Sequence, residues 1–386
     1  MATILKGTGT LALAAFDKTA SLKKHEFGRP APGPTDVAID IKFCGMCHSD
    51  LHACNGEWGL ECFPIAPGHE IAGLIKEVGS DVTEFKVGDR VGVGCWVESC
   101  RCCDLCKQGL EQHCAHVVQT FSTPFPKDKG ENFKECAGSH TNGGYSTDIV
   151  VNQHFVFHLP DSIPLEYAGP LLCAGITTFS PLNRYVLKKG GSKKVGVVGL
   201  GGLGHMAVKI AKAMGSDVTV FSRNTKKHKN AKALGAKLMI HTDEESLKAV
   251  MHTFDIILDT VSHHHDIAPL VNTLKVGGTY VLLGLPPQPI EIAVFPLVFT
   301  RSRIEGSLVG GVPETKEMLE FCAQHNIVPD IHVIHAKDAS AQFKAMNDGT
   351  AGADRAVIDI TTLKGMSGWQ HPRDVSDEDW FPNDEL

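Results

Sequence analysis

The stretch KKVGVVGLGGLGHMAVKIAKAMGSDVTVFSR, residues 193–223, decides the fold of the second half of this 386-residue chain. An apolar run is followed by a glycine-rich turn, a stretch with helical periodicity and a second apolar run. Further apolar runs follow at residues 237–242, 254–261 and 277–285, with helix-like segments between them. Strands that alternate with helices predict a doubly wound parallel sheet.

Within this stretch, Gly199, Gly201 and Gly204 fit the pattern G-x-G-x-x-G. The pattern alone is weak, but here it directly follows a strand-like run and opens a helix-like one, which is the context the motif requires. Such glycines let a pyrophosphate approach a helix N-terminus, where the N–H groups and the helix dipole favour an anion. We therefore expect a dinucleotide site.

The end of the next strand indicates which dinucleotide binds. A carboxylate there would bind the ribose 2′-hydroxyl of NAD(H), but the strand ends with Ser222 and Arg223, and Lys227 follows closely. No carboxylate repels a 2′-phosphate, and two cations can pair with one. We interpret this basic cluster as a selector for NADP(H), with a plain solvated surface as the alternative.

The first 170 residues or so are rich in Gly, Pro and short β-like runs, which predicts an irregular β-rich domain. The net charge of −7 argues against a nucleic-acid surface, and no apolar run approaches the ~18–20 residues of a membrane helix. Thirteen cysteines, an odd number without a secretory signal, favour a reducing, cytoplasmic compartment over a disulfide framework.

Four cysteines fall as C-x2-C-x2-C-x7-C: Cys100, Cys103, Cys106 and Cys114. Four thiolates on a turning loop can surround Zn²⁺ tetrahedrally and close its coordination sphere, which predicts a structural zinc site. Cys102 lies outside the ligand spacing. An iron–sulfur cluster and free thiols in a loop remain the alternatives.

A second potential metal site is spread over the motifs CGMCHSDLH (44–52), PGHE (67–70) and LLCAGITTF (171–179). Two thiolates and one imidazole, with water in the fourth position, form the open zinc site of alcohol dehydrogenases. The spacing does not choose between Cys44 and Cys47. Asp50 and Glu70 lie beside ligand candidates and can orient an imidazole from outside the coordination sphere.

With these motifs, the sequence resembles the zinc-dependent medium-chain alcohol dehydrogenases, and most of all their cinnamyl-alcohol-dehydrogenase-like branch. The resemblance runs from about residue 10 to residue 362. It rests on the three motifs above, the four-cysteine loop, CAGITTFSPL (173–182), GLGGLGHMAVKIAKAMG (199–215) and GGTYVLLGLP (277–286).

The resemblance implies that Cys47, and not Cys44, binds the catalytic zinc together with His69 and Cys173. A cysteine as third ligand is similar to the alcohol dehydrogenases, because the polyol-dehydrogenase branch usually has a glutamate there. Glu70 matches the acid that can approach the metal.

The resemblance also implies a proton relay, in which Ser49 takes the substrate proton and His52 is the outer end. It gives His48 a contact with the cofactor pyrophosphate. The cofactor-binding residues that it implies are His48, Thr177, Gly199, Leu200, Gly201, Gly202, Leu203, Gly204, Ser222, Arg223 and Lys227.

The implied fold is a GroES-like β-rich catalytic domain, residues 1–173 and 311–364, with a Rossmann NADP-binding domain inserted at 174–310. Residues 365–386 form an acidic extension. The implied protein is a homodimer with two zinc ions per chain that interconverts primary alcohols and aldehydes, aromatic or medium-chain aliphatic. Zinc polarises the substrate oxygen and NADP(H) carries the hydride. Because NADPH is the expected cofactor, aldehyde reduction is the expected direction.

The sequence departs from the family in two places: residues 121–142 form a longer segment than usual, and the tail is extra. The long segment lies near where the family builds its substrate mouth, so it leaves the substrate open. Our candidates for the pocket wall are Trp58, Leu60, Cys95 and Phe121, with ordinary core packing as the alternative. A polyol or secondary-alcohol dehydrogenase is the rival enzyme. A catalytically silent NADP(H)-binding module is the rival from another class.

Overall fold

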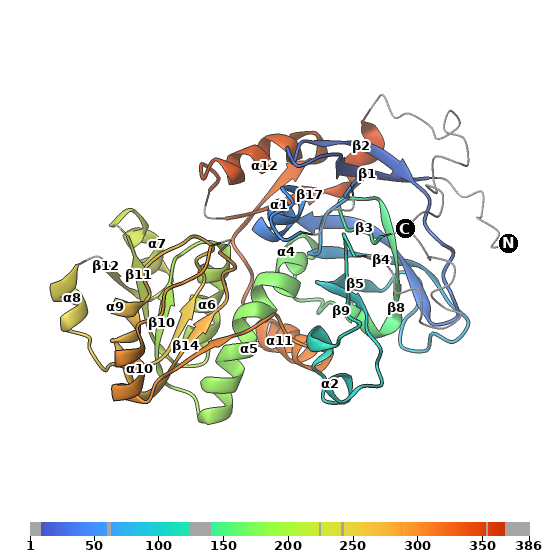
Figure 1. Ribbon diagram of the computed structural model, residues 1–386. Helices are drawn as coiled ribbons and strands as arrows, with labels where there is room; N and C mark the ends of the chain where they lie inside the picture. Colours follow the sequence, from blue (N-terminus) through green and yellow to red (C-terminus); the bar gives the residue numbers. More distant parts are fainter. Residues whose placement is uncertain are drawn as a thin grey trace. The chain divides into compact units, whose positions relative to one another are not determined.

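The computed structural model describes residues 9–59, 63–123, 140–223, 225–240, 243–286, 288–352 and 354–366. Two compact units divide the chain (Figure 1), one from residues 1–172 and 331–386 and one from 173–330. Each unit has its own sheet, and each is described by itself below.

The second unit is built on a parallel sheet of six strands among the described residues, in the order β12-β11-β10-β13-β14-β15. The strands are β10 (Lys194–Val198), β11 (Asp217–Ser222), β12 (Lys237–Ile240), β13 (Phe254–Asp259), β14 (Leu274–Leu282) and β15 (Arg303–Gly306). The helices are α5 (Ile176–Tyr185), α6 (Gly202–Ala213), α7 (His228–Ala233), α8 (Glu244–Lys248), α9 (Ala268–Val271), α10 (Val294–Thr300) and α11 (Val312–Gln324).

Numbered along this unit, the strand order is 3-2-1-4-5-6, the order of a Rossmann sheet, with its switch point between β10 and β13. The central strands are apolar because helices cover both of their faces: Val195, Val197 and Val198 in β10 are all buried. The parallel doubly wound sheet predicted from the sequence is confirmed.

The first unit is built on a mainly antiparallel sheet in the order β16-β17-β3-β4-β5-β9, with β8 also paired to β3. Its strands are β3 (Asp36–Gly45), β4 (Ile71–Val78), β5 (Arg90–Val93), β8 (Asp148–Asn152), β9 (Phe157–His158), β16 (Ile331–His335) and β17 (Arg355–Asp359). Two separate two-stranded sheets of the same unit are formed by β1 (Thr10–Ala15) with β2 (Leu22–Phe27), and by β6 (Trp96–Glu98) with β7 (Val118–Gln119). Its helices are α1 (His48–Cys54), α2 (Asp104–Lys107), α4 (Leu165–Pro170) and α12 (Ala339–Asn347).

The last strands, β16 and β17, return to the first unit. β17 pairs with β3 next to the turn that leads into α1, so residues more than 300 positions apart meet there. Our domain prediction assigned residues 311–330 to the catalytic domain, and that boundary stays a prediction. Helix α11 packs on α5, and these residues group with the second unit.

Backbone hydrogen bonds join the two ends of the long segment, residues 121–142. The Ser122 N–H donates to Thr141 O, and the Thr141 N–H donates to Thr123 O. Residues 124–139 between them, Leu60 of the predicted pocket wall and residues 367–386 of the predicted extension lie outside the described residues. Among the helices that the structure does describe, none has the length and apolar character to cross a bilayer.

Candidate active site and nucleotide site

The buried carboxylate of Asp50 organises the first metal site. Its Oδ2 accepts a hydrogen bond from the N–H of Cys47 (2.8 Å), the residue that precedes α1. Its Oδ1 accepts from the Gly68 N–H (2.9 Å) and lies 3.0 Å from Nδ1 of His69. The carboxylate therefore fixes the ring of His69 and leaves Nε2 as the nitrogen that can bind a metal.

Electrostatics support this orientation of the imidazole. Burial is the largest single effect and lowers the pKa of His69, but Asp50, Cys95 and Cys47 together outweigh it, and the pKa is raised well above its usual value. The Tyr145 hydroxyl lies 3.3 Å from the second oxygen of Asp50, and burial raises the pKa of this tyrosine, so the hydroxyl stays a donor.

Four side chains bring their ligand atoms within 4.8 Å of one another: Cys47, His69, Glu70 and Cys173. Cys173 lies on the π-helical turn Leu171–Gly175, directly after the last residue of the first unit. Two thiol sulfurs, an imidazole and a carboxylate form a donor set that suits zinc. Cys44, the candidate that spacing could not exclude, is not in this group; its buried thiol points back to the carbonyl of Gly45, 3.7 Å away.

Glu70 is fully buried in this group. Arg355 on β17 places Nη2 3.5 Å from Glu70 Oε1, an ion pair that is too long for a hydrogen bond, and its Nη1 donates to Met46 O (2.8 Å). Within the described part of the chain, neither carboxylate oxygen of Glu70 has a hydrogen-bond partner. Burial raises the pKa of Glu70 to about 7, against the lowering effect of Arg355. Buried carboxylate oxygens that accept no hydrogen bond and lie beside two thiols are suited to bind a cation.

The two predicted relay residues lie on α1. Ser49 Oγ is 3.6 Å from Cys47 Sγ. His52 lies three residues further along, so both side chains project from the same side of the helix. His52 Nδ1 is 2.5 Å from Glu57 Oε2, whereas its buried Nε2 has no hydrogen-bond partner among the described residues.

Three of the predicted pocket residues lie near these groups. The Phe121 ring is buried, with its centroid 5.8 Å from that of His69. The Trp58 ring lies 5.3 Å from that of His52 and is partly exposed. Cys95 is close enough to His69 to affect its pKa. Their role in substrate binding stays a prediction.

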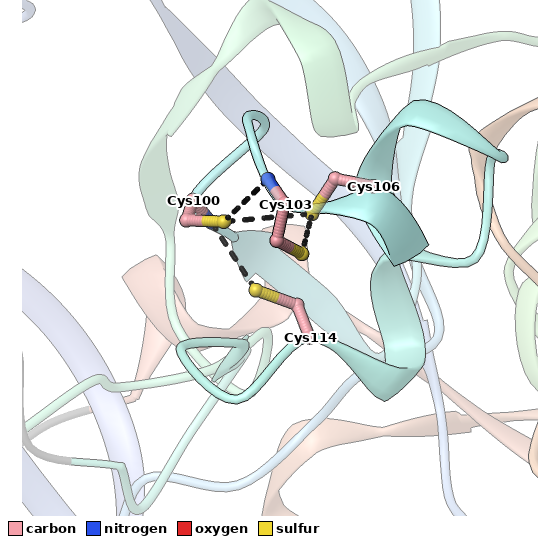
Figure 2. Close-up of side chains that lie close together, drawn as sticks. All are labelled: Cys100, Cys103, Cys106 and Cys114. Carbon is pink, nitrogen blue, oxygen red and sulfur yellow. Dashed lines mark hydrogen bonds between the residues drawn. The ribbon is translucent and has the colours of Figure 1, made fainter.

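The four-cysteine loop forms the second group of metal ligands (Figure 2). The Cys103 and Cys106 sulfurs are 3.6 Å apart, and those of Cys100 and Cys106 are 3.9 Å apart. A disulfide needs about 2.05 Å. A tetrahedron with Zn–S bonds of about 2.3 Å needs S–S separations near 3.8 Å, which these distances match.

The backbone of this loop prepares the sulfurs for a cation. The N–H of Cys103 donates to the Cys100 sulfur (3.3 Å), and the N–H of His116 donates to the Cys114 sulfur (3.4 Å). Backbone N–H donors lower the pKa of Cys100 to about 5, whereas burial raises that of Cys106 to about 12. Cys102 is exposed and outside the group, as the spacing predicts.

The glycine-rich loop between β10 and α6 has the geometry of a dinucleotide site. Gly199 has φ +85°, and a side chain there would meet Val261 and Thr260 at 3.0–3.1 Å. Gly204 packs so closely on Gly199 that a Cβ would lie 2.4 Å from its carbonyl oxygen. Gly201 precedes the first turn of α6, so the N–H groups of this helix terminus face the loop.

The predicted 2′-phosphate residues follow β11. Ser222 is the last residue of that strand and is buried, and Arg223 next to it is exposed. Lys227 Nζ donates to the carbonyl of Leu200 in the glycine-rich loop (2.9 Å). Burial, with Arg223 nearby, lowers the pKa of Lys227. Thr177 bonds through its hydroxyl to Cys173 O (2.7 Å), and His48 begins α1.

Sequence reasoning missed three residues of the first site. Arg355 pairs with Glu70 from a strand near the end of the chain, Tyr145 approaches Asp50 and Glu57 pairs with His52. For the first two no local signal existed, because contacts between distant segments of the chain bring them to the site. Glu57 lies only five residues after His52 and was within reach of spacing arguments.

A Rossmann unit with an NADP-type loop, joined to a β-rich unit that carries one open and one closed group of metal ligands, defines a metal-dependent dehydrogenase. Comparison with known proteins agrees. The family model described as "Alcohol dehydrogenase GroES-like domain" matches residues 33–161, and that described as "Zinc-binding dehydrogenase" matches residues 202–324.

Individual relatives are similar over almost the whole chain. NADP-dependent alcohol dehydrogenase C 1 of Mycolicibacterium smegmatis is 51% identical over 326 residues, 84% of this chain and 90% of that protein. A cinnamyl alcohol dehydrogenase structure from Sorghum bicolor has a TM-score of 0.86 at 39% identity and covers 92% of this chain and 98% of its own. The cinnamyl alcohol dehydrogenase structure from Helicobacter pylori complexed with NADP(H) has a TM-score of 0.83 at 42% identity, covering 92% and 99%.

The chain therefore belongs to the zinc-dependent medium-chain alcohol dehydrogenases, in their cinnamyl-alcohol-dehydrogenase-like branch. It is an oxidoreductase of alcohols and aldehydes, as the sequence resemblance implied.

Proposed function

We propose that this protein reduces aldehydes to primary alcohols with NADPH, at a site formed by Cys47, His69 and Cys173. The observation that carries the proposal is the convergence of these ligand atoms within 4.8 Å, around an imidazole that a buried carboxylate orients. When bound there, zinc supplies Lewis-acid polarisation of the substrate oxygen. The nicotinamide supplies the hydride.

The residues around the site bind, orient and move a proton. Asp50 holds Nδ1 of His69 and the backbone of Cys47, so two of the ligands depend on one carboxylate. Ser49, beside the Cys47 sulfur, donates its hydroxyl proton to the oxygen of the reduced substrate. His52 reloads Ser49 from solvent, since its Nε2 carries no other hydrogen bond among the described residues while Glu57 holds Nδ1.

The cofactor in this proposal is NADP(H). Arg223 and Lys227 supply two cations after β11, and no carboxylate ends that strand. The names of the relatives from M. smegmatis and H. pylori support the same cofactor. A preference for NADPH in turn favours aldehyde reduction over alcohol oxidation.

The substrate class that we propose is aromatic, cinnamyl-type or medium-chain aliphatic aldehydes. The support is the aromatic side chains Phe121 and Trp58 close to the metal and relay residues, together with the cinnamyl alcohol dehydrogenase relatives. A polyol substrate is disfavoured because Cys173 stands where the polyol branch usually has a glutamate.

We also propose a cytoplasmic homodimer. Thiolate ligands must stay reduced to hold zinc, which suits the cytoplasm. In the second unit, helix α10 leaves apolar side chains 65–72% exposed: Val294, Phe295, Val298 and Phe299. An exposed apolar patch of this kind marks an interface, and a second copy of the chain is the partner proposed. Phe299→Asp should yield monomers by light scattering, whereas Val276→Asp, at an equally exposed position on β14, should not.

The central test compares two neighbouring cysteines. Cys47→Ser, like His69→Ala, is expected to abolish aldehyde reduction while NADPH binding, followed by fluorescence, stays nearly intact. Cys44→Ser is the matched control, because this buried thiol lies three residues away and outside the ligand group. Loss of NADPH binding in the Cys47 variant, or loss of turnover in both cysteine variants alike, would count against the assignment. A protein with both zinc ions bound and no turnover would instead favour a silent binding module.

A further inference from the structure

A second buried carboxylate, Asp259, lies at the end of β13 in the nucleotide-binding unit. Its Oδ1 accepts a hydrogen bond from the N–H of Val261 (3.1 Å), and its Oδ2 accepts one from the Tyr280 hydroxyl (3.0 Å). Nε2 of His265 lies 3.0 Å from the same Oδ2. Asp259 is 1% exposed, so its charge depends on these three groups rather than on water.

His265 faces an acceptor with each ring nitrogen. Nδ1 lies 2.8 Å from the carbonyl oxygen of His263, and Nε2 faces the Asp259 carboxylate. The Nε2 contact is an ion pair rather than an aligned hydrogen bond. A neutral imidazole with its N–H on Nδ1 would turn the lone pair of Nε2 toward the carboxylate of Asp259, so this geometry fits the imidazolium.

The segment that this ion pair closes lies against the glycine-rich loop. Thr260 donates its hydroxyl hydrogen to Val198 O (2.7 Å), at the end of β10. A Cβ on Gly199 would meet Val261 at 3.0 Å, and one on Gly284 would lie 2.1 Å from the carbonyl oxygen of Val261. Thr260 and Val261 are therefore the wall against which the first glycine of the motif packs, and Asp259 holds that wall through the Val261 N–H.

We propose that His265 is a positioning residue of the nucleotide site: its imidazolium, paired with Asp259, fixes residues 260–265 against the glycine-rich loop and makes NADP(H) binding tighter at lower pH. The proposal rests on NADP(H) being the cofactor, but not on the metal site. His265 does not touch the cofactor in this scheme; it acts through Val261 and Gly199.

The direction of the pH effect follows from the groups around the ring. The Asp259 contact raises the pKa of His265, burial lowers it, and the His263 carbonyl and Asp266 raise it, with a net increase above the usual value. Tyr280 stays protonated because burial and Asp259 raise its pKa well above the usual value. His265 is thus fully protonated, and the ion pair with Asp259 fully formed, below the ordinary histidine pKa of about 6.5. The ion pair is lost as the pH rises through the raised pKa of His265.

The test measures the NADPH dissociation constant of full-length protein by fluorescence between pH 6 and pH 9. The readout is the dissociation constant of His265→Gln divided by that of the wild type at the same pH. Other groups that titrate, including the cofactor phosphate, affect both proteins equally and therefore cancel in this ratio. We expect a ratio of about five at pH 6, the lower end of ordinary coupling between sites, falling to one at high pH. His264→Gln, on the exposed neighbouring position, is the matched control and should give a ratio of one throughout.

A second variant keeps the test decisive if the glutamine perturbs folding. His265→Lys retains a cation at every pH in the range and should keep tight binding at pH 9, where the wild type weakens. A ratio of one for His265→Gln at all pH values, a ratio that does not change with pH, or an equal effect of His264→Gln would overturn the proposal. Wild-type protein that does not bind NADPH would instead contradict the proposed function.

Discussion

Replacing Asp50 with asparagine should release the catalytic metal although the change removes no ligand. Oδ1 of Asp50 accepts hydrogen bonds from the Gly68 N–H and from Nδ1 of His69. Oδ2 accepts them from the Cys47 N–H and the Tyr145 hydroxyl. All four contacts come from donors, and an asparagine has one acceptor oxygen. Either orientation of the amide therefore faces its NH₂ group toward at least one backbone N–H that cannot turn away.

The magnitude follows from these contacts. One buried N–H without an acceptor costs about 1–3 kcal/mol, and losing the charge of the acceptor weakens the remaining bonds, so we expect a loss of about 3 kcal/mol in unfolding free energy. If the NH₂ group faces His69, the imidazole proton moves to Nε2 and blocks the nitrogen that binds the metal. Loss of such a partner typically weakens metal binding 10–100-fold.

The assay is zinc competition with a chromogenic chelator, together with urea unfolding. Asp50→Asn should lose one of two zinc ions at a chelator concentration that leaves the wild type intact. Asp259→Asn is the matched control, because it also removes a buried carboxylate with several donors but has no metal ligand beside it. It should lower stability and keep both zinc ions. Wild-type zinc affinity in Asp50→Asn would contradict the role of Asp50 in orienting His69 and Cys47.

Two further predictions concern the other sites. Replacing Arg223 and Lys227 together by alanine should raise the KM for NADPH about a hundredfold, because two charge-assisted contacts of about 1.5 kcal/mol each are lost. The KM for NADH should stay nearly unchanged. Equal effects on the KM values of both cofactors would contradict the role of these residues as a selector for NADP(H). Cys103→Ser should reduce the zinc content from two ions to one and lower the melting temperature, whereas Cys102→Ser should change neither quantity in metal analysis and thermal unfolding.

The sequence was sufficient to predict the secondary structure and the cysteine loop that depend on patterns of neighbouring residues. The run from residue 193 to 223 predicted β10, α6 and β11, because the period of its apolar residues changes where the structure changes. The spacing of Cys100, Cys103 and Cys106 predicted sulfur atoms close enough to share a cation, since a short loop limits how far they can separate.

Contacts between distant segments were beyond sequence reasoning. Arg355 approaches Glu70 only because β17 returns to pair with β3, and nothing near residue 355 indicates an ion pair. The spacing of the cysteines could not decide whether Cys47 or Cys44 binds the metal, and only the family resemblance indicated Cys47. In the structure, Cys47 directly precedes α1 and belongs to the ligand group, whereas Cys44 lies within β3 and does not. Helix α11 packs on α5, a tertiary contact that its sequence does not encode locally.

The most direct test of the central claim is a set of initial rates for cinnamaldehyde, benzaldehyde and hexanal, each with NADPH and with NADH, on protein shown to hold two zinc ions. We expect reduction of these aldehydes with a strong preference for NADPH. Equal rates with NADH would contradict the role of Arg223 and Lys227, and no turnover with either cofactor would contradict the assignment of Cys47, His69 and Cys173 as a catalytic site.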